Sequence, residues 1–318
     1  MISVLGKSKK SKSEAYLDKK EIPLRFKYNV KHLEIIPKRL VSSMFMGNYK
    51  SIFRGRGLEF EDFRQYVLGD DARLIDWRAS LKTGELLIKE FIEERNLNVF
   101  FILDVSSKMC AGSIDKFKNE YAAEFVAAVS YAVMGVGDSV GLGMFSEDVI
   151  NFVPPNTGPS QFYSIRKELI NSENYGGGYD LKKALKYFGE IVERGAMLLV
   201  ISDFIGIVNQ EGSEELETLL KTLSKKYDVI GVMVRDVRDR ELPRGVGNVL
   251  VSDPETGKEV VINPDEMGSE YENYVRAEED SIRKMFIRSN ASMLMLDTNK
   301  SFMYPMLRFF KRRSEQFR

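Results

Sequence analysis

The chain of 318 residues carries 47 basic and 47 acidic side chains, so its formal net charge is zero. This balance excludes the global positive field that sequence-independent nucleic-acid binding requires. Hydrophobic residues make up 43% of the chain, which is enough for a sizeable core. The chain has one cysteine, Cys110, and one histidine, His32. These counts exclude a disulfide framework and a zinc site built from Cys and His. No stretch approaches about 18 apolar residues, so we expect no integral membrane segment and a reducing, cytoplasmic location.

The sequence changes character near residue 96. Residues 1–19 include a basic, serine-rich stretch, and we expect them to form a flexible tail. Residues 20–96 are dense in charge and in turn glycines, which predicts a smaller β-rich element with one short helix at 31–45. Residues 97–318 have a different periodicity, and we expect them to form an α/β domain onto which the smaller element packs.

A cluster of charges with one tryptophan lies in the second half of the smaller element: Arg64, Asp70, Asp71, Arg73, Asp76 and Trp77. Forked Arg–carboxylate pairs can fix a turn-rich segment onto a domain, and Trp77 is then expected to pack between the two parts. The same residues also suit an exposed surface for a protein partner, and a group of catalytic carboxylates is the third alternative. The sequence leaves these alternatives open.

From residue 98 onward, apolar runs of strand length alternate with segments whose apolar residues recur every three or four positions. This alternation predicts a doubly wound, mainly parallel sheet with helices on both faces. Strands are expected at 98–103, 139–145, 149–153, 196–201, 228–234 and 292–296, and a hairpin at 249–252 and 259–262. Helices are expected at 116–134, 161–170, 181–192, 214–227, 265–289 and 303–311.

Polar residues follow the buried strands, where ligands bind in open α/β sheets. We therefore predict one binding edge formed by Asp104, Ser106, Lys108, Tyr179, Asp180 and Asp203. Carboxylate and hydroxyl oxygens suit Mg²⁺ or Mn²⁺, so Asp104, Ser106 and Asp203 are candidate metal ligands.

The order Asp104-x-Ser106, a glycine-rich loop and then Ser202-Asp203 resembles von Willebrand factor A domains, which carry a metal-ion-dependent adhesion site. Further motifs are similar to the family named "domain of unknown function 58", over roughly residues 35–313: Arg54–Phe60, Arg64–Tyr66, Gly69–Trp77, Lys89–Phe91, Glu93–Arg95, Ser202–Phe204, Glu241–Pro243 and Asp253–Gly257. The resemblance implies a von Willebrand factor A-type fold and a frequent genomic link to AAA+ ATPases of the MoxR type. It implies no settled activity.

Two positions depart from the adhesion-site pattern. Lys108 stands where the second serine is expected, and Tyr179 stands where the loop threonine is expected. A lysine ammonium cannot ligate a cation, so we expect Lys108 to fill the ion's place and to pair with Asp104 and Asp203. Binding of Mg²⁺ or Mn²⁺ stays open as the alternative, and we expect no other cofactor.

These observations favour a non-enzymatic adaptor with a degenerate metal site. Its expected partners are a MoxR-type ATPase and an unknown client protein. The alternative is a metal-dependent hydrolase using Asp104, Asp203 and Asp180, for which the sequence offers no evident general base of tuned pKa. Nucleic-acid binding through the basic termini is disfavoured by the balanced charge.

Overall fold

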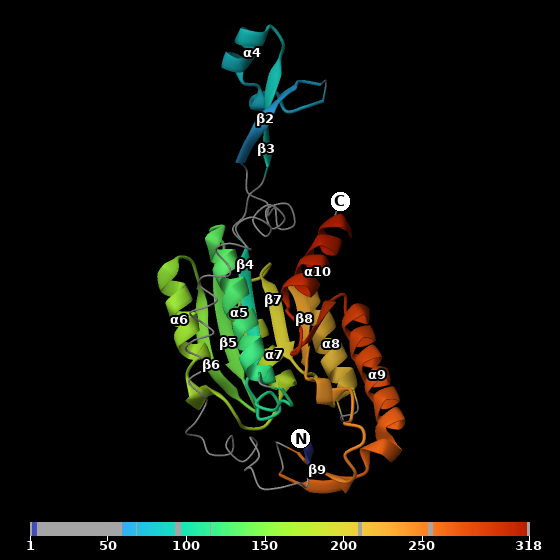
Figure 1. Ribbon diagram of the computed structural model, residues 1–318. Helices are drawn as coiled ribbons and strands as arrows, with labels where there is room; N and C mark the ends of the chain where they lie inside the picture. Colours follow the sequence, from blue (N-terminus) through green and yellow to red (C-terminus); the bar gives the residue numbers. More distant parts are fainter. Residues whose placement is uncertain are drawn as a thin grey trace.

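The computed structural model describes residues 2–4, 59–67, 69–92, 97–114, 116–208, 212–253 and 257–316. Its centre is a six-stranded sheet in the order β11-β8-β7-β4-β5-β6 (Figure 1). The strands are β4 (Asn98–Asp104), β5 (Ser139–Phe145), β6 (Val149–Asn156), β7 (Met197–Ser202), β8 (Asp228–Arg235) and β11 (Ser292–Asp297). Neighbouring strands are parallel except β6, which runs antiparallel to β5. The predicted mainly parallel α/β fold is therefore confirmed.

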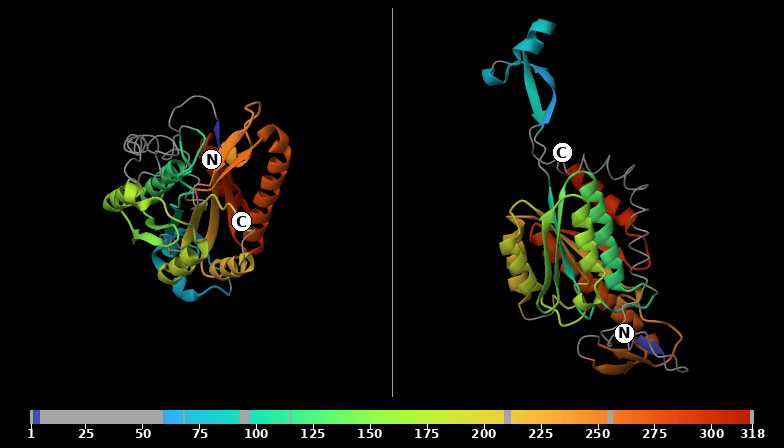
Figure 2. Two further views of the ribbon diagram at one scale, coloured as in Figure 1. Left: turned by 90° about the horizontal axis from the view of Figure 1, so that it is seen from below. Right: turned by 90° about the vertical axis from the view of Figure 1, so that its left-hand side faces the viewer.

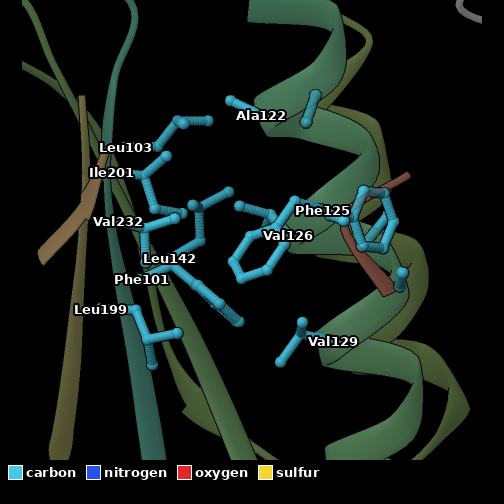
Figure 3. Packing of buried hydrophobic residues seen from close by; sticks show 14 of the residues in the cluster. Phe101, Leu103, Ala122, Phe125, Val126, Val129, Leu142, Leu199, Ile201 and Val232 are labelled. Carbon is cyan, nitrogen blue, oxygen red and sulfur yellow. The ribbon is translucent and has the colours of Figure 1, made fainter. Parts of the chain in front are cut away.

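Helices cover both faces of this sheet, as Figure 2 shows from two further directions. One face carries α5 (Lys118–Gly135), α6 (Pro159–Leu169) and α10 (Met303–Gln316), and the other carries α7 (Leu181–Ile191), α8 (Ser213–Ser224) and α9 (Pro264–Arg288). Side chains of β4 alternate between the two cores. Phe101 and Leu103 face α5, where they meet Phe125 and Val126 (Figure 3), whereas Phe100 packs with the α7 side. The uninterrupted apolar run of β4 follows from burial on both faces.

Strand register aligns the carboxyl ends of the central strands. Leu103 pairs with Ile201 of β7, and Asp104 pairs with Phe145 of β5. The residues that follow β4 and β7 therefore meet at one edge of the sheet, which we call the strand-end edge.

A second, three-stranded sheet has the order β1-β9-β10, with β1 (Ile2–Val4), β9 (Val249–Ser252) and β10 (Glu259–Ile262). The predicted hairpin at 249–262 is confirmed by the antiparallel pairing of β9 with β10. Residues 2–4 form a strand rather than part of a flexible tail. The rest of that predicted tail, and the helix predicted at 31–45, lie outside the described residues.

The described part of the smaller element is an antiparallel hairpin with one short helix, which we call the hairpin unit (residues 59–92). It contains β2 (Glu59–Gln65), the 3-10 turn η2 (Ala72–Leu74), α4 (Trp77–Thr83) and β3 (Leu87–Ile92). In Figure 1 it lies beyond the amino end of β4, and β9 lies at the opposite end of the sheet. No helix among the described residues has the length and apolar character needed to span a bilayer.

The sequence did not predict α4. Asp76 caps its first turn by accepting from the backbone N–H groups of Arg78 and Ala79, both at 3.0 Å. Gly84 ends the helix in the left-handed region, with φ of 77°. Both capping residues stand in the sequence, but the helix has no apolar stripe facing a core, so periodicity gave no signal.

Candidate functional site

Asp104 lies at the carboxyl end of β4 and is 1% exposed. Its Oδ1 accepts from the backbone N–H of Ser106 at 2.9 Å, and its Oδ2 accepts from Ser202 Oγ at 2.6 Å. Burial raises the pKa of Asp104 to about 6, and the negative charge of neighbouring Asp203 adds to the rise. The two carboxylates are thus brought together, as the sequence predicted.

Asp203 follows β7 and is fully buried. Its Oδ1 accepts from the backbone N–H of Ile205 at 3.0 Å, and its Oδ2 lies 2.7 Å from Lys118 Nζ. Burial alone would raise the pKa of Asp203, but the positive charges of Lys118 and Arg235 outweigh it and hold the pKa below its usual range. Asp203 is therefore ionised and paired inside the protein.

Lys118 is the first residue of α5 and is 2% exposed. Its ammonium nitrogen also lies 3.2 Å from Asp239 Oδ2, in the 3-10 turn η4 (Val237–Asp239) after β8. Burial alone would lower the pKa of Lys118, but Asp203 and Asp239 raise it above its usual range. One ammonium group thus joins the ends of β7 and β8 to the start of α5.

The loop after β4 delivers Lys118 to this position. It folds back so that the Asn119 N–H donates to the carbonyl of Met109 at 2.8 Å. Glu120 accepts from the backbone N–H of Phe117 at 2.9 Å and closes the first turn of the helix. A positively charged side chain is unfavourable at a helix N-terminus, where the helix dipole is itself positive. A lysine at the start of this helix was therefore a sequence signal that could have identified the residue.

The prediction that Lys108 pairs with Asp104 and Asp203 is wrong. Lys108 Nζ lies over the Tyr179 ring, 4.3 Å from its centroid, and the ammonium on Asp203 belongs to Lys118. The turn Ser107–Cys110, closed by donation from Cys110 N–H to the Ser107 carbonyl at 3.2 Å, places Lys108 there.

Tyr179 does face the site. Its hydroxyl lies 3.3 Å from Ser202 Oγ, and burial with the charge of Asp104 raises its pKa well above the usual value. Asp180, the next residue, instead caps α7 by accepting from the backbone N–H of Lys183 at 2.9 Å. The structure therefore gives Asp180 a capping role beside the carboxylate pair.

These residues do not fit a divalent cation. Both oxygens of Asp104 and both oxygens of Asp203 already have partners, and the partner of Asp203 Oδ2 is itself a cation. Ser106 Oγ is the one candidate ligand that is buried without a hydrogen-bond partner among the described residues. Within that part of the chain, no three His, Cys, Asp or Glu side chains are grouped so that they could hold a metal ion. Mg²⁺ needs several oxygen ligands in octahedral geometry, and the Lys118 ammonium on Asp203 would repel it at this position.

A second buried ion pair supports the same edge. Arg235, at the end of β8, is 1% exposed and its Nη2 lies 3.2 Å from Glu278 Oε2 of α9. The other oxygen of Glu278 accepts from the backbone N–H of Gly206 at 2.9 Å. The loop after β7, which carries Asp203, is thereby held from α9 as well as from α5.

A hollow of about 180 Å³ opens at the same edge, between the starts of α7 and α8. Its lining consists of Tyr179, Asp180, Leu181, Lys182, Ile207, Gly212, Ser213 and Leu216. Two residues of the predicted binding edge thus border a concave surface, whereas Asp104 and Asp203 are buried behind it.

The charged residues of the hairpin unit form local pairs. Arg64 binds Asp70 through two hydrogen bonds of 2.7 and 2.9 Å, and this pairing lowers the pKa of Asp70 to about 2. Arg73 lies 2.9 Å from Asp71 and likewise lowers its pKa. Trp77 is 64% exposed, so the prediction that it packs between the two parts of the chain is wrong.

Comparison with known proteins identifies a family. The family model described as "Protein of unknown function DUF58" matches residues 62–281. The chain is 25% identical over 281 residues to the uncharacterized protein Rv1480 of Mycobacterium tuberculosis and to Mb1516 of Mycobacterium bovis, which covers 87% of this chain and 86% of each relative.

Solved structures with a similar fold include an aerotolerance-related membrane protein from Bacteroides fragilis, at 18% identity and a TM-score of 0.45 over 68% of this chain and 99% of that one. A von Willebrand factor type A protein from Catenulispora acidiphila matches at 12% identity and a TM-score of 0.39, over 72% of this chain and 44% of that one. The SpRpn10 VWA domain matches at 9% identity and a TM-score of 0.37, over 70% of this chain and 95% of that one.

Proposed function

The chain belongs to the DUF58 family, and we propose that it works as a protein-interaction adaptor rather than as an enzyme. Its partner is an AAA+ ATPase of the MoxR type, with which it acts on a client protein. The partner class rests on what the family resemblance implies, a frequent genomic link to such ATPases. The interaction role rests on the surface of the hairpin unit.

Six large apolar side chains are exposed on that unit, and together we call them the hairpin surface: Phe63, Val67, Leu74, Trp77, Leu81 and Leu86. Trp77 and Leu81 lie one helical turn apart on α4 and are 64% and 84% exposed. Neighbouring exposed apolar groups of this size are typical of protein-binding sites, and tryptophan is enriched among the residues that dominate binding energy. This surface is the observation that carries the proposal.

The polar surroundings of these side chains support the same function. The Arg64–Asp70 and Arg73–Asp71 pairs lie within the same turn-rich segment and neutralise its charges locally. An apolar centre with polar neighbours is the usual anatomy of a protein interface. The predicted partner surface and the hairpin surface lie in the same unit of the chain, residues 59–92, and Trp77 belongs to both.

The strand-end edge supports an adaptor over the hydrolase alternative. A metal-dependent hydrolase needs open coordination positions beside its carboxylates. Asp104 and Asp203 are instead buried and hydrogen-bonded on both oxygens, and Asp180 caps a helix.

The test is binding of the purified chain to the MoxR-type ATPase encoded in the same genome. We expect the double substitution Trp77→Ser, Leu81→Ser to weaken binding at least tenfold, because it removes the apolar centre of the surface. Tyr304→Ser is the matched control, since Tyr304 is 82% exposed on α10, outside the hairpin unit. Failure of the wild-type chain to bind the ATPase, or equal binding by the double variant, would overturn the proposal.

A further inference from the structure

We infer that the Lys118 ammonium supplies at the strand-end edge the positive charge that a divalent cation supplies in the fold family, through Asp203 and Asp239, so that the edge is complete without a metal. This inference concerns the internal chemistry of the edge and does not depend on the identity of the partner. It assigns to Lys118 a role that the Asp-x-Ser motif places on a bound ion.

The first argument is the position of the ammonium nitrogen. It lies 2.7 Å from Asp203 Oδ2 and 3.2 Å from Asp239 Oδ2. It therefore bridges carboxylates from two different strand ends, which is what a bound cation does at such an edge. Both the lysine and Asp203 are buried, so water does not replace either partner.

The second argument is how the remaining oxygen atoms are used. Asp203 Oδ1 accepts from the Ile205 N–H, and the two oxygens of Asp104 accept from Ser106 N–H and Ser202 Oγ. Every carboxylate oxygen of this pair has a donor from the protein itself. A divalent ion on Asp203 would also have to lie close to the Lys118 ammonium, a group of like charge.

The third argument is that the chain holds this cation by covalent attachment. Lys118 begins α5, and its backbone is fixed because the neighbouring Asn119 N–H donates to the Met109 carbonyl at 2.8 Å. A tethered ammonium does not dissociate when free metal is removed. The edge should therefore keep its structure in a chelator, unlike a site whose cation exchanges with solvent.

The experiment compares the wild-type chain with Lys118→Met, which keeps an unbranched side chain one atom shorter and removes its charge. Each protein is stripped with EDTA and then titrated with Mg²⁺ or Mn²⁺, by calorimetry and by thermal unfolding. We expect the wild type to bind neither ion and to keep the same Tm in EDTA and in excess metal. Lys118→Met should have a lower Tm in EDTA and a higher Tm in Mn²⁺, because Asp203 and Asp239 then lack a cation.

Lys118→Arg is the matched control and should respond to neither ion, since it keeps the positive charge. Saturable binding of one ion by the wild type, lost in Asp203→Asn, would overturn the inference. A folded Lys118→Met protein that binds neither ion and whose Tm is unchanged by both would also overturn the inference. If Lys118→Met folds in neither buffer, the wild-type titration is the test. The absence of binding by the wild type supports the inference, and saturable binding overturns it.

Discussion

The hairpin unit and the strand-end edge use the same kinds of side chain in opposite ways. On the hairpin unit, Trp77 and Leu81 are exposed while the charged groups pair locally at the surface. At the strand-end edge, charged groups such as Lys118 and Asp203 are buried and the surrounding strands are apolar. The contrast is between two physical roles: buried charges that pair with one another stabilise a structure, whereas exposed apolar groups gain free energy when another surface covers them.

The same contrast separates two ion pairs of equal length. Arg64–Asp70 and Lys118–Asp203 both measure 2.7 Å, but the first has side chains 42% and 22% exposed and the second 3% and 0%. Water and salt screen the exposed pair, so its removal should matter little. Removal of one partner from the buried pair leaves an uncompensated charge in the interior.

The largest effect is therefore expected for Lys118→Met. Without the ammonium, Asp203 and Asp239 lose the cation that lies between them and Asp203 keeps only the more distant charge of Arg235, so the free energy of unfolding should fall by about 3–5 kcal/mol in the absence of metal. Chemical denaturation in EDTA at neutral pH measures this loss.

Lys116→Met is the control for that variant, because Lys116 lies two residues earlier and pairs with Glu124 at 2.6 Å from a side chain that is 34% exposed. Its loss should be much smaller. Equal destabilisation by the two substitutions would show that the strand-end edge does not depend on its internal cation.

A second prediction concerns the pH dependence of stability. The pKa of Asp104 rises from an ordinary value of 3.8 to about 6 in the folded protein, so the folded state holds a proton that the unfolded state releases. This contribution is present at low pH and is lost as the pH rises from about 4 through about 6, at a cost on the order of 3 kcal/mol. Asp104→Asn cannot lose a proton there, so it should become more stable than the wild type by that amount at neutral pH.

Urea denaturation of Asp104→Asn and of the wild type across this pH range provides the measurement. Asp203→Asn is the matched comparison and should destabilise at neutral pH, because the pKa of Asp203 is lowered and its charge is paired with Lys118. A loss of stability in both variants would mean that Asp104 is needed as an ionised group.

The substitution Trp77→Ser tests the hairpin surface, the exposed region in this comparison. Since Trp77 is 64% exposed, its removal should change the free energy of unfolding by no more than about 0.5 kcal/mol. If the proposed ATPase partner binds this surface, its binding should weaken by about 2 kcal/mol, the scale of a residue that dominates an interface. Paired unfolding and binding measurements on one preparation separate the two effects, and a large loss of stability with intact binding would reverse the assignment.

The smallest effect is expected for Asp70→Asn, which removes the exposed partner of Arg64. The lowered pKa of Asp70 means that its contribution to stability is present above the ordinary pKa of 3.8 and is lost as the pH falls toward about 2. At neutral pH the change in Tm should be close to measurement error and should vanish in added salt. A clear loss of Tm that persists in added salt would indicate that the Arg64–Asp70 pair is shielded from solvent by another part of the protein.

The sheet was readable from the sequence because its strands are buried on both faces and continuous apolar runs result. The predicted strand 139–145 coincides with β5, and the predicted runs 249–252 and 259–262 coincide with β9 and β10. Helix α4 was missed because Trp77 and Leu81 face solvent, so no amphipathic period marks it. Its capping residues, Asp76 and Gly84, were the only local signal.

The candidate site was predictable in its residues but not in its internal contacts. Motif spacing placed Asp104 and Asp203 at one edge because the carboxyl ends of parallel strands meet there. It could not decide which lysine supplies the cation. Lys108 occupies the motif position, but the turn that follows β4 directs it to Tyr179, and the helix start fourteen residues after Asp104 brings Lys118 to the carboxylates. That outcome depends on loop folding, which spacing along the chain does not encode.

The most direct measurement is a crystal structure of the wild-type chain grown in excess Mn²⁺, with anomalous data collected at the manganese edge. The internal cation predicts no anomalous peak between Asp104, Ser106 and Asp203, and Lys118 Nζ within hydrogen-bond distance of Asp203. A manganese peak bound by those three residues, with the Lys118 side chain displaced, would contradict the account.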